Sequence, residues 1–210
     1  DPARMADAAR MCVEAGADLI DINMGCPVRK VTKTGAGATL ISDGAERGAR
    51  VVAAVAEAVD VPVTVKMRRG ELNESRDFTI AGPRFVEAGA QALTLHPRSA
   101  KQMYTGHADH ALTAELVELV SVPVIASGDI TSRARAQSVL ARTGAAAVMV
   151  GRGSQGNPWA LREIVDGDGG GVISGDKMST AIRKARLDED IKALVLRVDS
   201  PGGSVSASEQ

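Results

Sequence analysis

Apolar and polar positions along residues 1–165 switch between two patterns. Apolar residues spaced three and four positions apart predict helices, and short runs of consecutive aliphatic residues predict strands buried on both faces. The predicted helices cover residues 3–15, 45–58, 78–88, 114–120, 133–142 and 157–165. The predicted strands cover residues 19–24, 61–67, 92–96, 122–126 and 146–150. This alternation indicates an α/β fold of parallel βα units, either doubly wound or part of a (β/α)8 barrel.

The joints between these elements agree with the pattern. Gly16, Gly89 and Gly144 each stand where a predicted helix ends and a strand follows, which is the usual place for a helix-terminating glycine. Pro62 and Pro123 stand at the start of two predicted strands, where a missing N–H is tolerated.

After residue 165 the pattern changes. Residues 166–175 are rich in glycine and acidic residues, a composition typical of a linker or turn. Residues 176–210 then predict a separate segment, with a helix over 178–186 and a strand over 191–198. We therefore expect a first domain over 1–165, a junction over 166–175 and a second unit over 176–210.

Composition narrows the class of protein. With 44% hydrophobic and 24% charged residues the chain is typical of a globular protein, and with 2% aromatic residues its core should consist of Ala, Val, Ile and Leu. The net charge of −1 does not indicate nucleic-acid binding by the chain as a whole, so a basic surface would have to be local. Two cysteines fit a reduced, cytoplasmic setting. The sequence contains neither a signal peptide nor an apolar run long enough to span a membrane.

Polar residues gather where the five predicted strands end. Chemistry collects at the carboxyl ends of parallel strands, and these ends carry the following residues: Asn23, Gly25, Cys26 and Pro27; Lys66, Arg68 and Arg69; His96, Arg98 and Lys101; Ser127, Gly128 and Asp129; Gly151, Arg152 and Gly153. The alternative is that these residues are ordinary surface charges, but such charges would be scattered and not gathered at the strand ends. The set therefore predicts a binding site.

Several of these residues suggest a role by their chemistry. Gly128 and the Gly151–Gly153 turn could hold a phosphate on backbone N–H groups, with Arg152 adding charge. Lys66 and His96 could hydrogen-bond a polar ring. Cys26 could be a thiolate nucleophile, which nearby cations would favour, or a proton donor.

Two further expectations concern the thiols and the histidines. Cys12 lies on the apolar face of a predicted helix and is expected to be a small core residue. The three histidines and Cys26 lack the spacing of a metal site, so none is predicted.

Five motifs, taken together and in this order, resemble the tRNA-dihydrouridine synthase family, close to its bacterial B-type branch. They are DINMGCPVRKVTKTGAGATL, VKMRRG, LTLHPRSAKQMYTGHAD, VPVIASGDI and VMVGRGSQGNPW. The resemblance covers nearly all of residues 1–165. It implies the last five βα units of an FMN-binding (β/α)8 TIM barrel, without the first strands and the C-terminal helical domain of the family. Activity of this partial barrel is therefore expected to be impaired.

The resemblance also implies a reaction. Uridine in tRNA is reduced to 5,6-dihydrouridine with NADPH as reductant; FMN gives hydride to carbon 6, and Cys26 gives a proton to carbon 5. Lys66, His96, Gly128, Asp129, Gly151 and Arg152 match the cofactor-binding positions. Asn23, Arg29, Lys30, Lys33 and Arg98 are expected on the substrate side, where Arg29, Lys30 and Lys33 would meet tRNA phosphate.

The stretch IKALVLRVDSPGGSVSASE, in residues 176–210, resembles a different family, the ClpP-like signal peptide peptidase A proteases. That resemblance implies a short ClpP/crotonase-like βα fragment whose nucleophile and general base are not in this sequence. Two alternatives to the flavoenzyme therefore stand: a serine peptidase fragment, and an inactive chimeric remnant. A dihydroorotate dehydrogenase-like flavin barrel is a further alternative, which the GCPVRKVTKTGAG and LHPRSAKQMYTG motifs disfavour.

Overall fold

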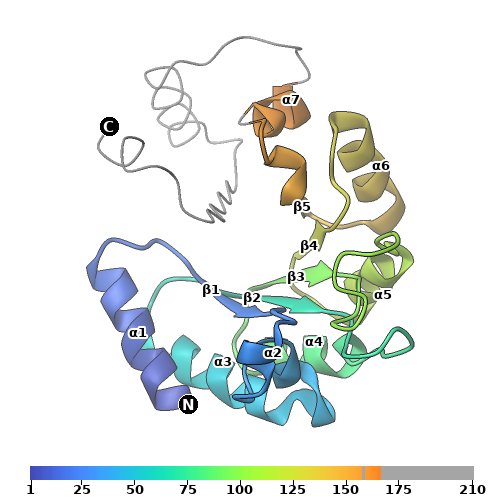
Figure 1. Cartoon of the computed structure of the whole chain (residues 1–210). Coiled ribbons are helices and arrows are strands. Elements are labelled where there is room, and N and C mark those ends of the chain that lie inside the picture. Colours follow the sequence, from blue (N-terminus) through green and yellow to red (C-terminus); the bar gives the residue numbers. More distant parts are fainter. Residues whose placement is uncertain (158, 167–210) are drawn as a thin grey trace. The chain divides into compact units, whose positions relative to one another are not determined.

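The structure is a computed structural model that describes residues 1–157 and 159–166. Its five strands are β1 (Ile20–Met24), β2 (Val63–Arg68), β3 (Ala92–His96), β4 (Val124–Ser127) and β5 (Ala147–Met149). They form one parallel sheet in the order β1-β2-β3-β4-β5. The spatial order follows the sequence order without reversal (Figure 1), so the described sheet is wound in one direction. This excludes the doubly wound alternative for these residues and is compatible with part of a (β/α)8 barrel.

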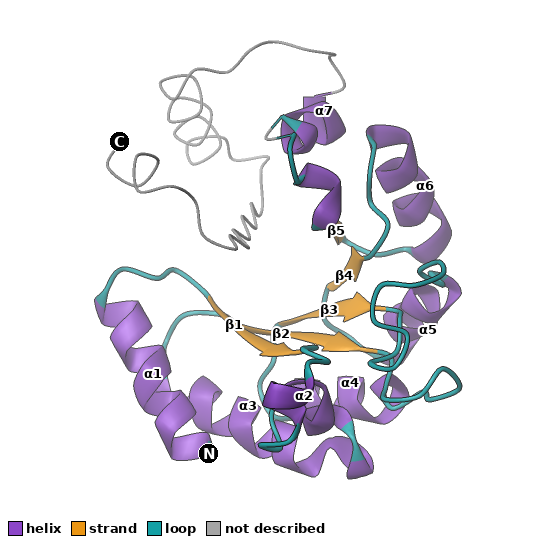
Figure 2. Cartoon of the chain, in the orientation of Figure 1, coloured by secondary structure: helices purple, strands orange, loops and turns teal. Residues whose placement is uncertain are grey.

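Helices lie between consecutive strands, as parallel pairing requires. In chain order the described helices are α1 (Pro2–Glu14), α2 (Arg29–Thr32), α3 (Glu46–Ala58), α4 (Phe78–Glu87), α5 (Ala111–Leu119), α6 (Arg133–Thr143) and α7 (Ala160–Asp166), with short 3₁₀ turns η1 (Gly37–Ile41), η2 (Asp43–Ala45) and η3 (Arg152–Ser154). Of these, α1 precedes β1 and α7 follows β5. The long connecting helices lie along the outer side of the curved sheet in Figure 2. The predicted segments of the second unit lie outside the described residues.

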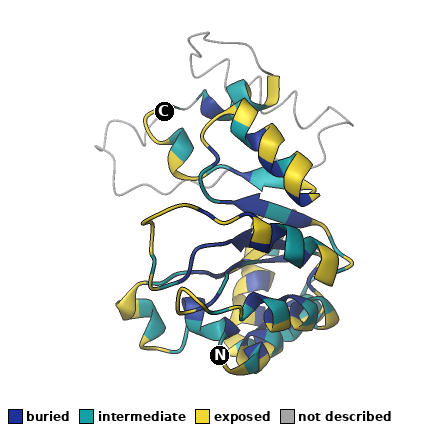
Figure 3. Cartoon of the chain, turned by 90° about the vertical axis from the view of Figure 1, so that its right-hand side faces the viewer, coloured by how far each residue is buried: buried dark blue, intermediate teal, exposed yellow. Residues whose placement is uncertain are grey.

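The core forms between the sheet and these helices. Side chains of β1, β2 and β3 pack with those of α3, α4 and α5, and Figure 3 shows the strands as mainly buried. The aliphatic core expected from composition is present, but Phe78, Phe85, Met24 and Met67 are also fully buried in it. A second cluster packs α6 against β4 and contains Ala126, Ala136 and Val139.

The predicted elements agree with the observed ones except at their ends. Two strands begin after the proline rather than before it, at Val63 and Val124. Pro62 and Pro123 still take part in the sheet through their carbonyls, which accept from Ile20 N–H and Leu93 N–H at 2.9 and 3.0 Å. A proline carbonyl can accept a hydrogen bond, but proline has no N–H to donate. Pro62 and Pro123 can therefore begin strand pairing only through their carbonyls.

Two sequence-based expectations about local structure were incomplete or wrong. Cys12 is exposed and not part of the core, because α1 buries only Ala6 and Ala9. α2 and the η1 and η2 turns were not predicted. They are too short to show a hydrophobic period, and Gly37 and Gly44 adopt positive φ angles of 62° and 75° within the turns.

Candidate functional site

The carboxyl ends of all five strands lie along one edge of the sheet. The register sets Asn23 of β1 beside Lys66 of β2, and Arg68 of β2 beside His96 of β3. Ser127 at the end of β4 pairs in turn with Met149 at the end of β5. Parallel pairing therefore brings the predicted candidates from five distant parts of the sequence to one edge.

The Gly25-Cys26-Pro27 loop is held from both sides. The Asn23 side chain accepts a hydrogen bond from Gly25 N–H at 3.0 Å, and Ala38 N–H donates to the Cys26 carbonyl at 2.9 Å. A Cβ atom on Gly37 would lie 2.5 Å from the same carbonyl, so only glycine fits at that point. The half-buried Cys26 thiol thus sits on a loop whose backbone is fixed.

Arg68 is the main tether of this loop; the sequence placed it among the polar strand-end residues but gave it no role. Its side chain is 3% exposed. Nε donates to the Gly25 carbonyl at 2.9 Å, and Nη1 donates to the carbonyls of Ser99 and Met103, both at 2.9 Å. Burial lowers the pKa of the guanidinium from its usual value, but the group stays charged at neutral pH. One cation therefore joins the loops that follow β1 and β3.

His96 ends β3 and is 8% exposed. Burial, followed by the positive charges of Arg68 and Lys66, lowers its pKa to about 3. The ring is therefore neutral at physiological pH. It can donate or accept a hydrogen bond, but it cannot serve as a cationic acid there.

Lys66 is half-buried near the end of β2, whereas the residues on both sides of it are buried. Its charge contributes to the low pKa of His96, and in the strand register Lys66 lies two residues before Arg68, the partner of His96. The structure thus brings Lys66, His96 and Asn23 to the same part of the edge.

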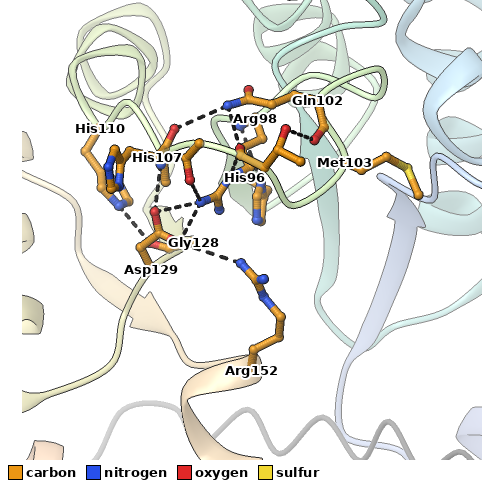
Figure 4. A network of polar contacts seen from close by, with 12 residues as sticks. His96, Arg98, Gln102, Met103, His107, His110, Gly128, Asp129 and Arg152 are labelled. Carbon is orange, nitrogen blue, oxygen red and sulfur yellow. Dashed lines mark hydrogen bonds and ion pairs between the residues drawn. The ribbon is translucent and has the colours of Figure 1, made fainter.

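Asp129 forms the centre of a polar network that follows β4 (Figure 4). Arg98 Nη2 lies 2.8 Å from both of its carboxylate oxygens, and Ala108 N–H donates to Oδ2 at 2.7 Å. Arg98 also donates to the carbonyls of Thr105 and Gly106, at 3.0 and 2.7 Å. Partial burial would raise the pKa of Asp129, but the bonds from Ala108 and Arg98 outweigh it and hold that pKa below its usual value.

This network changes the interpretation of two candidates. The sequence placed Arg98 on the substrate side, but the residue is 1% exposed and its charge is directed to Asp129. Arg98 Nε and Nη2 hold the loop between β3 and α5, whereas Nη1 has no hydrogen-bond partner among the described residues. Both oxygens of the Asp129 carboxylate are likewise engaged with protein groups.

Gly128 lies where three segments meet. Its carbonyl lies 2.9 Å from Nε2 of the buried His110. With φ of +109°, a Cβ atom there would lie 3.0 Å from the Ala108 Cβ and 3.4 Å from His96 Nε2. A side chain at this position would therefore crowd Ala108 and contact His96. The importance of His110 was not evident from the sequence, because only the fold brings it to β4.

The Gly151–Gly153 turn follows β5 and opens η3. A Cβ atom on Gly151 would have no neighbour within 4 Å. Arg152 is half-exposed, 3.7 Å from Asp129 Oδ1, and its guanidinium carbon lies 4.7 Å from the centre of the Tyr104 ring. Tyr104 also lies 5.6 Å from the guanidinium carbon of Arg68. The exposed Tyr104 ring, which the sequence did not single out, thus contacts cations from two strand ends.

The basic residues Arg29, Lys30 and Lys33 lie on α2 and at its end, directly after the Cys26 loop, and all three are exposed. Within the described residues, no group of three or more His, Cys, Asp or Glu side chains is arranged to hold a metal. No helix of that region is long and apolar enough to cross a membrane.

Comparison with known proteins adds information on ancestry. A family model described as dihydrouridine synthase (Dus) matches residues 1–183. The tRNA-dihydrouridine synthase B of Pseudomonas aeruginosa is 45% identical over 164 residues, which cover 78% of this chain and 49% of that protein. The protein of the same name from Escherichia coli K12 is also 45% identical over 164 residues, covering 51% of that protein. The chain spans about half the length of these curated relatives.

Among solved structures, a Burkholderia cenocepacia protein assigned as a phosphonomutase superposes with a TM-score of 0.50. It is 21% identical and covers 68% of this chain and 64% of its own. At that identity the likeness shows a shared fold only. The family match extends through the predicted junction at 166–175 and into the segment from 176. The peptidase-like assignment of 176–210 is not supported by these comparisons, and it lies outside the described residues.

Proposed function

Because the chain belongs to the dihydrouridine synthase family, we propose that it carries out the reduction of uridine to 5,6-dihydrouridine in tRNA. The observation that carries the proposal is the placement of Cys26. Its thiol is half-buried on a backbone fixed by Asn23, Ala38 and Arg68, at the same sheet edge as Lys66 and His96. A thiol carried on a fixed loop, at the same edge as the neutral His96, suits proton delivery to a polar ring.

FMN fits the residues at this edge. The position of a Cβ atom on Gly151 has no neighbour within 4 Å, and the half-exposed Arg152 follows, which suits a phosphate. Arg98 Nη1 is buried and has no hydrogen-bond partner among the described residues, so a donor remains for a ligand atom. The negative charge of Asp129 is offset by Arg98, so it would not repel that phosphate. When bound and reduced by NADPH, FMN would supply the hydride that carbon 6 requires.

The protein's own residues would do the remaining work. Lys66 and the neutral His96 would hydrogen-bond the flavin ring, and Gly128, Asp129 and Gly151 would offer backbone N–H groups to the phosphate. Asn23 would orient the uracil ring. Cys26 would donate its proton to carbon 5 of that ring, leaving a thiolate that solvent reprotonates.

The substrate would be a tRNA whose target base is flipped out of its stack. Arg29, Lys30 and Lys33, exposed beside the Cys26 loop, would contact its phosphates. A tRNA substrate would place the protein in the cytoplasm. The (β/α)8 barrel of which these five strands would form part is likewise a proposal, supported by their unbroken order.

The test compares the two cysteines of the chain. Full-length protein is incubated with FMN, NADPH and unmodified tRNA transcripts, and dihydrouridine is measured by mass spectrometry of nucleosides. Cys26→Ala should lower the rate by about 10²–10⁴-fold, the usual contribution of a general acid, with flavin fluorescence still showing bound FMN. Cys12→Ala, a change at the exposed thiol of α1, should leave the rate unchanged. Equal rates for the two variants would refute the role of Cys26.

A further inference from the structure

A groove of about 470 Å³ lies beside the Cys26 loop, between α2 and the loops that follow β2 and β3. Pro27, the residue after Cys26, is one of the residues that line it. The far wall is built by two loops that pair through their backbones, because Lys101 N–H donates to the Glu71 carbonyl at 2.9 Å and Ala100 N–H to the Gly70 carbonyl at 2.8 Å. The groove thus lies next to the loop that carries the candidate acid Cys26, and backbone hydrogen bonds join the two loops of its far wall.

The charges that line this groove are mainly positive. Arg29 and Lys33 come from the α2 side, Lys101 comes from the opposite wall, and Glu71 is the one carboxylate among the lining residues. The lining therefore carries three positive charges against one negative charge, in a chain whose net charge is −1. Hydroxyl groups of Thr32, Thr39 and Ser42 also line it.

These cations differ from the other basic residues near the site. Arg68, Arg98 and Arg152 all engage carbonyl or carboxylate oxygens of the protein. In the part of the chain that the structure describes, the side chains of Arg29, Lys33 and Lys101 have neither an ion pair nor a hydrogen bond. Their charge is not neutralised by the fold, so it is available to an external anion.

We infer that this groove binds the sugar–phosphate backbone of the RNA strand next to the target uridine, with Lys101 as a contact that faces α2 across the strand. This inference rests on the proposed function. It adds a second wall of the RNA site, which carries Lys101, to the cations on α2. Cations on both walls would hold a strand that passes through the groove, whereas cations on α2 alone would contact it from one side. Glu71 would weaken this binding by repelling phosphate.

The experiment measures the affinity of the full chain for a fluorescently labelled, unmodified tRNA by anisotropy, between about 50 and 300 mM KCl. Each lost phosphate contact should lower the slope of log K against log salt by about 0.7–0.9. Lys101→Ala should therefore lower the slope by about that amount, and the triple Arg29→Ala, Lys33→Ala, Lys101→Ala variant by about three times as much. Glu71→Gln should raise the affinity, by about 2-fold at the lowest salt.

The matched control is Arg142→Ala, which removes an exposed cation from α6. If Lys101→Ala and Arg142→Ala change the slope equally, the groove is not the RNA contact and the inference is overturned. If wild-type chain forms dihydrouridine and binds tRNA while Lys101→Ala keeps the wild-type slope, the inference alone fails. If wild-type chain neither binds tRNA nor forms dihydrouridine, the proposed function fails together with it.

Discussion

The buried pair between Arg98 and Asp129 makes the clearest prediction about stability. Asp129→Asn removes the charge that balances a guanidinium whose side chain is only 2% exposed. Asparagine is the appropriate replacement because residue 129 has φ of +54°, a left-handed conformation that asparagine adopts at less cost than alanine. The variant therefore tests the charge without adding backbone strain.

The magnitude follows from what Arg98 keeps and loses. Breaking a fully buried ion pair costs about 3–5 kcal/mol. Here Arg98 would retain the carbonyls of Thr105 and Gly106, and the Asp129 side chain is 23% exposed. We therefore expect the free energy of unfolding to fall by about 2–3 kcal/mol, between a lost charged hydrogen bond and a lost buried pair.

The assay is urea unfolding of the full chain, followed by circular dichroism at neutral pH. Asp43→Asn is the control, because Asp43 also has a positive φ, of 51°, but is exposed and has no ion pair among the described residues. In a double-mutant cycle with Arg98→Met, the two changes should cost less together than the sum of the single costs. An Asp129→Asn variant as stable as Asp43→Asn, or strictly additive costs, would refute the reasoning.

Three further predictions concern other parts of the site. Because the pKa of His96 falls from 6.5 to about 3 on folding, His96 binds a proton in the unfolded chain at a higher pH than in the folded one. Its contribution to the free energy of unfolding should therefore fall by about 1.4 kcal/mol when the pH is lowered from 7.5 to 5.5. His96→Gln should remove that part of the pH dependence in urea titrations, and an unchanged profile would contradict the prediction. Gly48→Ala should lower the midpoint of thermal unfolding, although alanine has the better helix propensity. The new Cβ would lie 2.5 Å from the Leu40 carbonyl and 2.8 Å from the Phe85 ring. A more stable variant would show that α3 can shift to make room. Arg68→Met should lower the free energy of unfolding by about 2–4 kcal/mol and slow dihydrouridine formation by at least about tenfold. A variant with wild-type turnover would show that the Cys26 loop keeps its position without Arg68.

The sequence was sufficient to predict the frame of this molecule. All five strands and the long helices between them were predicted, because buried parallel strands and amphipathic helices differ strongly in hydrophobic period. Glycines at positions 16, 89 and 144 were correctly predicted to terminate helices, and each has a positive φ. The concentration of polar residues at strand ends also predicted which edge of the sheet carries the candidate site.

What the sequence could not predict is which partner each side chain takes. Arg68 and Arg98 both follow buried strands and look alike in sequence. In the structure one binds three backbone carbonyls, and the other binds Asp129 across 31 residues of sequence. The exposure of Cys12 was missed for a similar reason, since an apolar face predicts burial only where another element covers it. Such partners depend on loop geometry, which has no periodic signal.

The contacts of Arg68 also tie two events together thermodynamically. One guanidinium holds both the Gly25 carbonyl and the carbonyls of Ser99 and Met103, so movement of one loop away from the other would break hydrogen bonds of Arg68. If a bound molecule shifts residues 99–103 and Arg68 moves with them, the loop beside Cys26 shifts as well, and the coupling free energy is the same in both directions. A ligand bound at residues 99–103 would therefore alter the affinity for a ligand beside the Cys26 thiol. A ligand beside the thiol would alter the affinity at residues 99–103 by the same factor.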